Sequence, residues 1–176
     1  MAGHNKWSKI KRQKAGTDAA KSKIFGKLAR AISTASREAK GNTTSPILRT
    51  AIEKAREFNM PSDNIERAIK KGVGTESEAL ESITYESYGP GGTALVIEAL
   101  TSNRNKAAQE VKFILSENGC ALAGVGSATW AFSKENGEWI PNMTVPISEE
   151  DSQKLEKLIN ELEENDEVQD IYTNAE

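Results

Sequence analysis

The chain has 176 residues, 37% of them hydrophobic and 28% charged, so it can bury the core of one large domain or of two small ones. No apolar run approaches the ~20 residues that cross a bilayer, and the Lys-rich N-terminus lacks the apolar stretch of a secretory signal. The single cysteine, Cys120, excludes an intrachain disulfide and a cysteine-based zinc site. These features favour a cytoplasmic protein without a membrane partner.

The net charge of −3 conceals a division between the two parts of the chain. Residues 1–72 hold 17 Lys and Arg against 6 Asp and Glu, a net charge of +11. Residues 73–176 hold 6 against 20, a net charge of −14. A basic module joined to an acidic one suggests that the basic module binds a polyanion.

The first forty residues are expected to form an arm and a helix. Residues 1–16 are polar and basic and contain Trp7. Apolar residues at helical spacing predict a helix from about Thr17 to Lys40. Gly41 then suits the left-handed residue that ends such a helix.

Two shorter helices follow in the basic part. Pro46 suits the first position of the second helix, with Ser45 as its cap. Asp63, with Glu66 three residues later, predicts a reciprocal cap for the third helix, and Gly72 is expected to end it. Three helices with short connections predict a helical bundle.

The acidic part alternates between strand and helix patterns. Strands are predicted over residues 83–88, 93–100, 128–132, 139–147 and 168–172. One helix is expected after the second strand, capped by Asn103 or Asn105, and another before the last strand, capped by Ser148. The Asn136-Gly137 pair predicts a hairpin between the third and fourth strands.

This order of elements predicts the fold class. From Thr93 the order strand, helix, strand, strand, helix, strand is that of a ferredoxin-like βαββαβ domain, and the strand at Ile83 is an extra leading strand. Right-handed crossovers would place both helices on one face of an antiparallel sheet. The expected protein is therefore α+β, with a basic three-helix domain over residues 1–74 and an acidic ferredoxin-like domain over residues 75–176.

Six blocks of sequence resemble the YebC/PmpR family over nearly the whole chain. They are Ala2-Gly3-His4-Asn5-Lys6-Trp7, Asn59-Met60-Pro61, Asp63–Gly72, Tyr88–Gly92, Gly126-Ser127 and Val168–Asn174. The resemblance implies a transcriptional regulator that binds DNA. It also implies an alternative, because the family is similar to the mitochondrial translational activator of cytochrome c oxidase subunit I, which acts on translation at the ribosome.

The sequence departs from the family pattern in one place. Usual members carry an extra α/β domain between the strand that ends near Phe132 and the strand near Met143. Only residues 133–142 stand between them here, with the Asn136-Gly137 turn inside. A hairpin is therefore expected in place of the inserted domain.

The candidate site is the N-terminal basic surface. The residues expected to contact nucleic acid are Lys6, Trp7, Lys9, Lys11, Arg12, Lys14, Lys21, Lys23 and Lys27, with Lys70 and Lys71 as a second contact. Lysines bind phosphates and release counterions, and Trp7 can stack on a base or a ribose. The alternative interpretations are a solvated tail for the arm and a helix-dipole role for Lys70 and Lys71.

Catalysis is not expected, because the single histidine and the single cysteine lie far apart in the sequence. No cofactor, no metal and a monomer are expected. The Gly89–Gly92 segment lacks the Gly-Lys-Ser/Thr ending of a phosphate-binding loop, which favours a tight turn. Three hypotheses remain: a regulator on duplex DNA, a ribosome-associated factor on RNA, and a protein-interaction module whose basic half binds an acidic partner. The acidic domain is expected to meet a ribosome or a protein partner.

Overall fold

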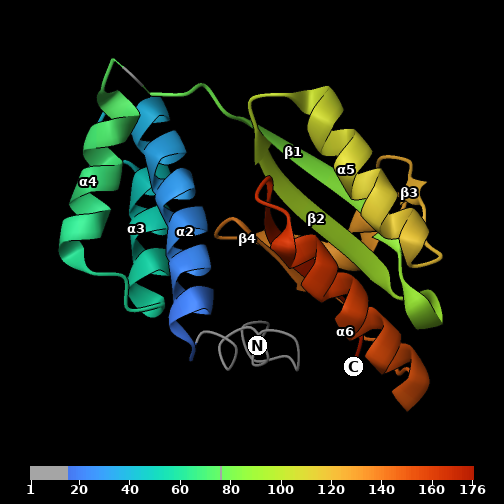
Figure 1. Ribbon diagram of the computed structural model, residues 1–176. Coiled ribbons are helices and arrows are strands. Elements are labelled where there is room, and N and C mark those ends of the chain that lie inside the picture. Colours follow the sequence, from blue (N-terminus) through green and yellow to red (C-terminus); the bar gives the residue numbers. More distant parts are fainter. Residues whose placement is uncertain (1–15, 76) are drawn as a thin grey trace. The chain divides into compact units, whose positions relative to one another are not determined.

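The computed structural model describes residues 16–75 and 77–176 and divides the chain into two compact units (Figure 1). The helical unit ends at Leu80, and the α/β unit extends from Glu81 to Glu176. The boundary falls where the first strand begins, six residues after the boundary predicted between residues 74 and 75.

The helical unit contains α2 (Asp18–Glu38), α3 (Pro46–Glu57) and α4 (Ser62–Val73). Its core is made by the apolar stripes that predicted the helices; the buried members are Leu28, Ile32, Ala35, Leu48, Ile52, Ala55, Met60, Ile65 and Ala68. The three leading helices of the predicted α+β fold are thereby confirmed.

The ends of α2 and α3 follow the predicted chemistry. Thr17 caps α2 by accepting a hydrogen bond from the Ala20 N–H at 3.2 Å. At the other end Gly41 has a φ of +76°, as predicted, and Lys40 before it is also left-handed. Ser45 is the N-cap residue of α3 and Pro46 its first residue, but the Ser45 side chain makes no capping hydrogen bond.

Two predictions about α4 are wrong. The reciprocal cap between Asp63 and Glu66 does not form, because the helix begins at Ser62 with Pro61 as its N-cap residue. Gly72 does not end the helix, since α4 continues to Val73.

Gly72 is instead a contact point between α4 and α2. A Cβ atom at Gly72 would lie 2.3 Å from the carbonyl oxygen of Ser33 and 2.7 Å from the Ser36 Cβ. The same serines donate their hydroxyls to α4, Ser33 to the Ala68 carbonyl at 2.9 Å and Ser36 to the Ile69 carbonyl at 2.7 Å. The absence of a side chain at Gly72 therefore sets how closely the two helices approach.

The α/β unit is built on a four-stranded sheet of order β3-β1-β2-β6. Its strands are β1 (Glu81–Tyr88), β2 (Ala94–Thr101), β3 (Leu122–Ala123) and β6 (Val168–Thr173). All three pairings are antiparallel, and β1 and β2 are the two interior strands. The extra leading strand predicted at Ile83 thus takes a position beside the center of the sheet.

The helices α5 (Arg104–Glu117) and α6 (Glu149–Glu164) lie together on one face of this sheet, as predicted (Figure 1). Of the two predicted caps for α5 the structure selects Asn103, whose side chain accepts from the Lys106 N–H at 3.0 Å. Ser148 caps α6, accepting from the Asp151 N–H at 3.1 Å.

The third and fourth predicted strands differ most from expectation. The apolar residues 128–131 form a 3₁₀ turn over Thr129–Ala131, and the strand β4 (Phe132–Glu135) follows that turn. β4 pairs only with β5 (Glu138–Pro141), so the two form a hairpin separate from the four-stranded sheet. Pro141 ends β5 early, because proline has no N–H to donate to a ladder.

The β4–β5 hairpin covers the sheet face opposite α5 and α6. Ala94 and Val96 of β2 share a hydrophobic cluster with Phe132, and Trp139 packs against it. The predicted turn is confirmed: Asn136 and Gly137 have φ values of +50° and +82°, as a two-residue hairpin loop requires.

Candidate nucleic-acid interface

The predicted contact residues on α2 do not all share one face. Ile32 marks the face that α2 buries. Lys23 and Lys27 lie on the opposite face at a spacing of four residues, whereas Lys21 is exposed and projects from the Ile32 side in the first turn.

Two arginines that the sequence analysis did not select extend the face of Lys23 and Lys27. Arg30 and Arg37 follow at seven and fourteen residues after Lys23, a spacing that returns to the same side of a helix. We call Lys23, Lys27, Arg30 and Arg37 the α2 basic stripe. At 1.5 Å per residue it is about 21 Å long.

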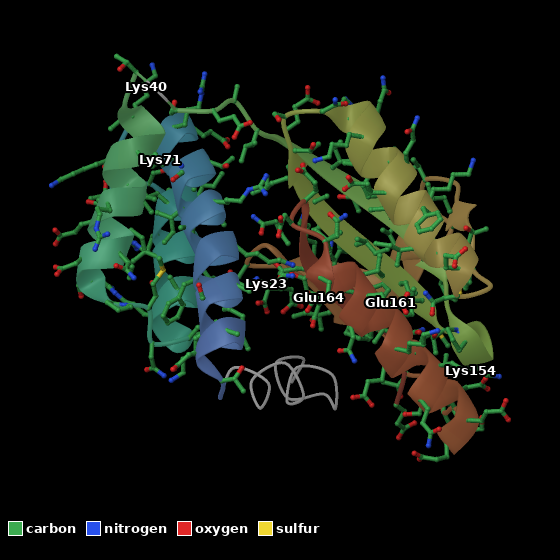
Figure 2. The ribbon with its side chains drawn as sticks, in the orientation of Figure 1. Lys23, Lys40, Lys71, Lys154, Glu161 and Glu164 are labelled. Atoms are coloured by element: carbon green, nitrogen blue, oxygen red, sulfur yellow. The ribbon has the colours of Figure 1, made fainter. Side chains whose placement is uncertain are left out.

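Lys70 and Lys71 belong to a different part of the helical unit. They lie in the last turn of α4, and both side chains are exposed. Gly41 approaches α4 closely, since a Cβ atom there would lie 3.2 Å from the Val73 side chain. Lys40 and Lys71 therefore lie at the same end of the unit, away from Lys23 (Figure 2).

The cluster of Lys40, Lys70 and Lys71 has a structural explanation. α2 and α4 both end here, so the negative ends of two helix dipoles meet the same lysines. Arg37 also ties the segment after α4 to α2, because its Nη1 donates to the Ser77 carbonyl at 2.8 Å. Nothing in these contacts requires a bound polyanion, so a nucleic-acid role for Lys70 and Lys71 stays a prediction.

Six of the predicted contacts lie outside the described residues. They are Lys6, Trp7, Lys9, Lys11, Arg12 and Lys14. Within the described helices the acidic residues are fewer than the basic ones, since residues 16–72 contain 12 Lys and Arg and 6 Asp and Glu. The described helical unit is thus basic without the arm.

The α/β unit contains a buried carboxylate that the sequence analysis missed. Glu86 of β1 is only 5% exposed, and its oxygens accept backbone hydrogen bonds from Gly126 at 2.7 Å, Ala128 at 2.9 Å and Thr129 at 2.7 Å. Burial raises the pKa of this carboxyl, but the three N–H donors outweigh burial and the net pKa is lowered. The charge fixes the loop before β4, so its role is structural.

Two aromatic side chains, Tyr88 and Trp130, contact the loop that Glu86 holds. The Tyr88 hydroxyl donates to the Ser127 carbonyl, and the Trp130 Nε1 donates to the same oxygen at 2.8 Å. Trp130 is 61% exposed, and Val125 at the tip of the loop is fully exposed. No signal in the local sequence predicts this arrangement, because Glu86 lies 40 residues before its first partner.

The glycine-rich segment before β2 forms the tight turn that was predicted. Gly89 N–H donates to the Thr93 carbonyl at 2.8 Å, which closes the turn between β1 and β2. Gly91 has a φ of +73°, and a Cβ atom there would lie 2.6 Å from the Ile147 side chain just before α6. The lack of a side chain at Gly91 therefore allows this turn to pack closely against the segment before α6.

Other chemical groups give no second site in the described part of the chain. Cys120 is half-buried, and burial raises the pKa of its thiol, which disfavours a nucleophilic thiolate. No group of three His, Cys, Asp or Glu in residues 16–75 and 77–176 is placed to hold a metal ion. None of the helices described there has the length and apolar character of a membrane span.

The chain is a two-unit α+β protein. A basic three-helix unit is followed by an acidic unit in which two helices cover one face of a sheet. The profile of the TACO1/YebC protein N-terminal domain matches residues 5–75, and that of the TACO1/YebC second and third domain matches residues 80–137 and 134–175. The chain belongs to the TACO1/YebC family, as the sequence blocks indicated.

Relatives support this assignment along the whole chain. A protein of Fervidobacterium nodosum is 40% identical over 235 aligned positions, which cover 99% of this chain and 93% of the relative. A protein of Petrotoga mobilis is 47% identical over 98% of this chain and 70% of its own length. Both relatives are named "Probable transcriptional regulatory protein".

A solved structure shares the fold. The crystal structure of the conserved hypothetical protein Aq1575 from Aquifex aeolicus matches with a TM-score of 0.81 at 34% identity. The match covers 98% of this chain and 97% of that one.

The comparisons also locate the difference in length. The alignment with the Fervidobacterium nodosum protein spans 235 positions against the 176 residues of this chain, so at least 59 positions of the relative have no counterpart here. The two matches to the second and third domain overlap at residues 134–137, the end of β4 and the turn of the β4–β5 hairpin. The hairpin stands where longer relatives carry their additional residues, in agreement with the predicted loss of the inserted domain.

Proposed function

We propose that this chain is a regulator of gene expression that binds nucleic acid through its helical unit, with duplex DNA as the target. The observation that carries the proposal is the α2 basic stripe, which aligns cations from Lys23 to Arg37 on one side of a helix about 21 Å long. Relatives named transcriptional regulatory proteins supply the class of function. The protein acts by binding, without covalent chemistry.

The chemistry of the stripe favours contact with the nucleic-acid backbone. Duplex DNA carries one phosphate charge per ~1.7 Å of axis, so a 21 Å line of cations meets several phosphates. Single cations on flexible stems neutralise phosphates without reading bases. The expected binding is therefore strongly salt-dependent and weakly dependent on sequence.

The test reverses three charges of the stripe, Lys23→Glu, Lys27→Glu and Arg30→Glu, and measures affinity for a duplex DNA fragment over a series of salt concentrations. Loss of three phosphate contacts is expected to reduce the slope of log K against log salt by about 2.7. The matched control makes the same charge change in the α/β unit with Lys112→Glu, Lys154→Glu and Lys157→Glu, which should leave the slope unchanged.

The same titration separates the alternatives. A structured RNA bound more tightly than DNA, together with cosedimentation with ribosomes that high salt reverses, would move the proposal to translation. Equal slopes for the wild type and the stripe variant would reject the stripe as a nucleic-acid contact and leave a protein-interaction module.

A further inference from the structure

A groove between α3 and α4 forms a second feature of the helical unit. Its volume is about 480 Å³, and it lies wholly within this unit. Its floor is apolar, with Ile52 from α3 and Ile65 and Ile69 from α4. Ile52 and Ile65 are only 8% and 5% exposed, so the half-buried Ile69 supplies most of the apolar surface that a ligand could contact.

The rim of the groove is charged and of mixed sign. Arg49, Glu53 and Arg56 recur on one side of α3 at spacings of four and three residues, and Glu66 faces them from α4. Among the described residues none of these four side chains has a hydrogen-bond or ion-pair partner. Guanidinium donors and carboxylate acceptors thus border the same apolar surface.

The mixed rim discriminates between classes of ligand. A phosphate alone would meet the two arginines but also the two carboxylates, which repel it. An apolar peptide segment would cover the isoleucines but remove four charges from water without pairing them. A planar ring with both donor and acceptor edges satisfies the floor and the rim together.

We propose that the groove holds an unpaired guanine base, from a single-stranded end or an opened base pair of the DNA bound by the helical unit, an inference that rests on the proposed function. The guanine O6 and N7 atoms accept the two parallel N–H bonds that an arginine side chain donates. The guanine N1–H and N2 amino groups donate to a carboxylate. Glu53 and Glu66 supply two such carboxylates, and the isoleucine floor contacts the face of the ring.

The base must be unpaired because its N1–H and N2 amino groups bond to the partner strand in a duplex, even though O6 and N7 can be reached from the major groove. Proteins read such splayed-out bases through their hydrogen-bonding edges. Adenine fits less well, since it presents an amino group where guanine presents O6 and lacks the N1–H and N2 donors. The groove therefore adds a base preference to the sequence-independent contact made by the α2 basic stripe.

The experiment compares two short single-stranded oligothymidylates that differ only in a central guanine or adenine. Fluorescence anisotropy at low salt should show about tenfold tighter binding of the guanine oligomer. The double variant Glu53→Gln and Glu66→Gln, and separately Arg56→Ala, should bind both oligomers as the wild type binds the adenine one. Glu38→Gln on α2 is the matched control and should keep the preference.

Two modified oligomers sharpen the assignment to atoms. Inosine removes the N2 amino group and should weaken binding to the wild type but not to the carboxylate variant. A 7-deazaguanine removes the N7 acceptor and should weaken binding to the wild type but not to Arg56→Ala. Circular dichroism melts of each variant establish that the helices are intact.

Each result decides between the two proposals. Equal wild-type affinity for both oligomers overturns the groove assignment and leaves the α2 contact standing. A guanine preference that survives in the carboxylate variant also overturns it, because the base then binds elsewhere. Failure of the wild type to bind any oligomer or duplex at low salt refutes the proposed function and the groove together.

Discussion

The two units differ in the chemistry of one structural contact that each contains. In the α/β unit a buried carboxylate makes one such contact, because Glu86 accepts hydrogen bonds from three backbone N–H groups. In the helical unit the neutral hydroxyls of Ser33 and Ser36 donate from α2 to backbone carbonyls of α4. The two contacts therefore differ in their response to pH, because only the carboxylate titrates.

The largest expected effect tests the neutral junction of the helical unit. Gly72→Ala places a Cβ atom 2.3 Å from the Ser33 carbonyl oxygen, so α2 and α4 must separate. We expect a loss of about 3 kcal/mol in the free energy of unfolding, measured by urea denaturation. The matched control is Gly26→Ala in α2, which meets nothing within 4 Å and should stabilise the unit by about 0.5–1 kcal/mol.

If Gly72→Ala and Gly26→Ala changed stability alike, helix propensity alone would explain both glycines. The close approach of α2 and α4 would then be without energetic consequence.

The next effect tests the buried charge of the α/β unit. Glu86→Gln keeps the shape of the side chain but replaces one acceptor oxygen by an NH₂ group that faces backbone N–H donors. We expect a loss of about 2 kcal/mol and a change in the fluorescence of Trp130 on the loop. Glu150→Gln, at a fully exposed position, is the control.

The pH dependence follows from the lowered pKa of Glu86. The folded form holds this carboxylate below its unfolded pKa of about 4.5, so its contribution is complete above that pH. The contribution is lost as the pH falls through the folded pKa. Wild-type protein should therefore lose more stability than Glu86→Gln between neutral pH and acid, and parallel curves would contradict the assignment.

The smallest effect separates the two roles offered for Lys70 and Lys71. Their replacement by alanine should cost about 0.5–1 kcal/mol of stability at low salt, because they oppose the C-terminal dipole of α4. The same variant should bind duplex DNA with an unchanged salt slope. A reduced slope with unchanged stability would instead make these lysines phosphate contacts.

The sequence predicted correctly those helices, caps and turns that are determined by residues close together in the chain. The helical spacing of apolar residues located α2 and α3, Ser148 capped α6, and Asn136-Gly137 formed its hairpin turn. The prediction of the third strand was wrong. Residues 128–131 have the composition of a strand, but in the structure they form a turn next to Glu86.

The missed features depend on partners far away in the sequence. From the local sequence Gly72 is expected to end a helix, because the sequence does not show that Ser33 of α2 lies beside it. Glu86 is expected to be an ordinary strand residue, because the sequence does not show that a distant loop donates hydrogen bonds to it. The α2 basic stripe is an exception. The spacing from Lys23 to Arg30 and Arg37 was present in the sequence, and counting charges by helix face would have found it.

The isolation of the β4–β5 hairpin has an evolutionary consequence. Its backbone hydrogen bonds run between its own two strands, so lengthening the loop at residues 136–137 leaves the ladder of the main sheet intact. Loop-closure entropy grows only slowly with length, so a whole module can enter or leave at this turn at small thermodynamic cost. The turn of this hairpin is therefore a site where a domain can be gained or lost during evolution. A second protein can also be inserted there without changes to the rest of the α/β unit.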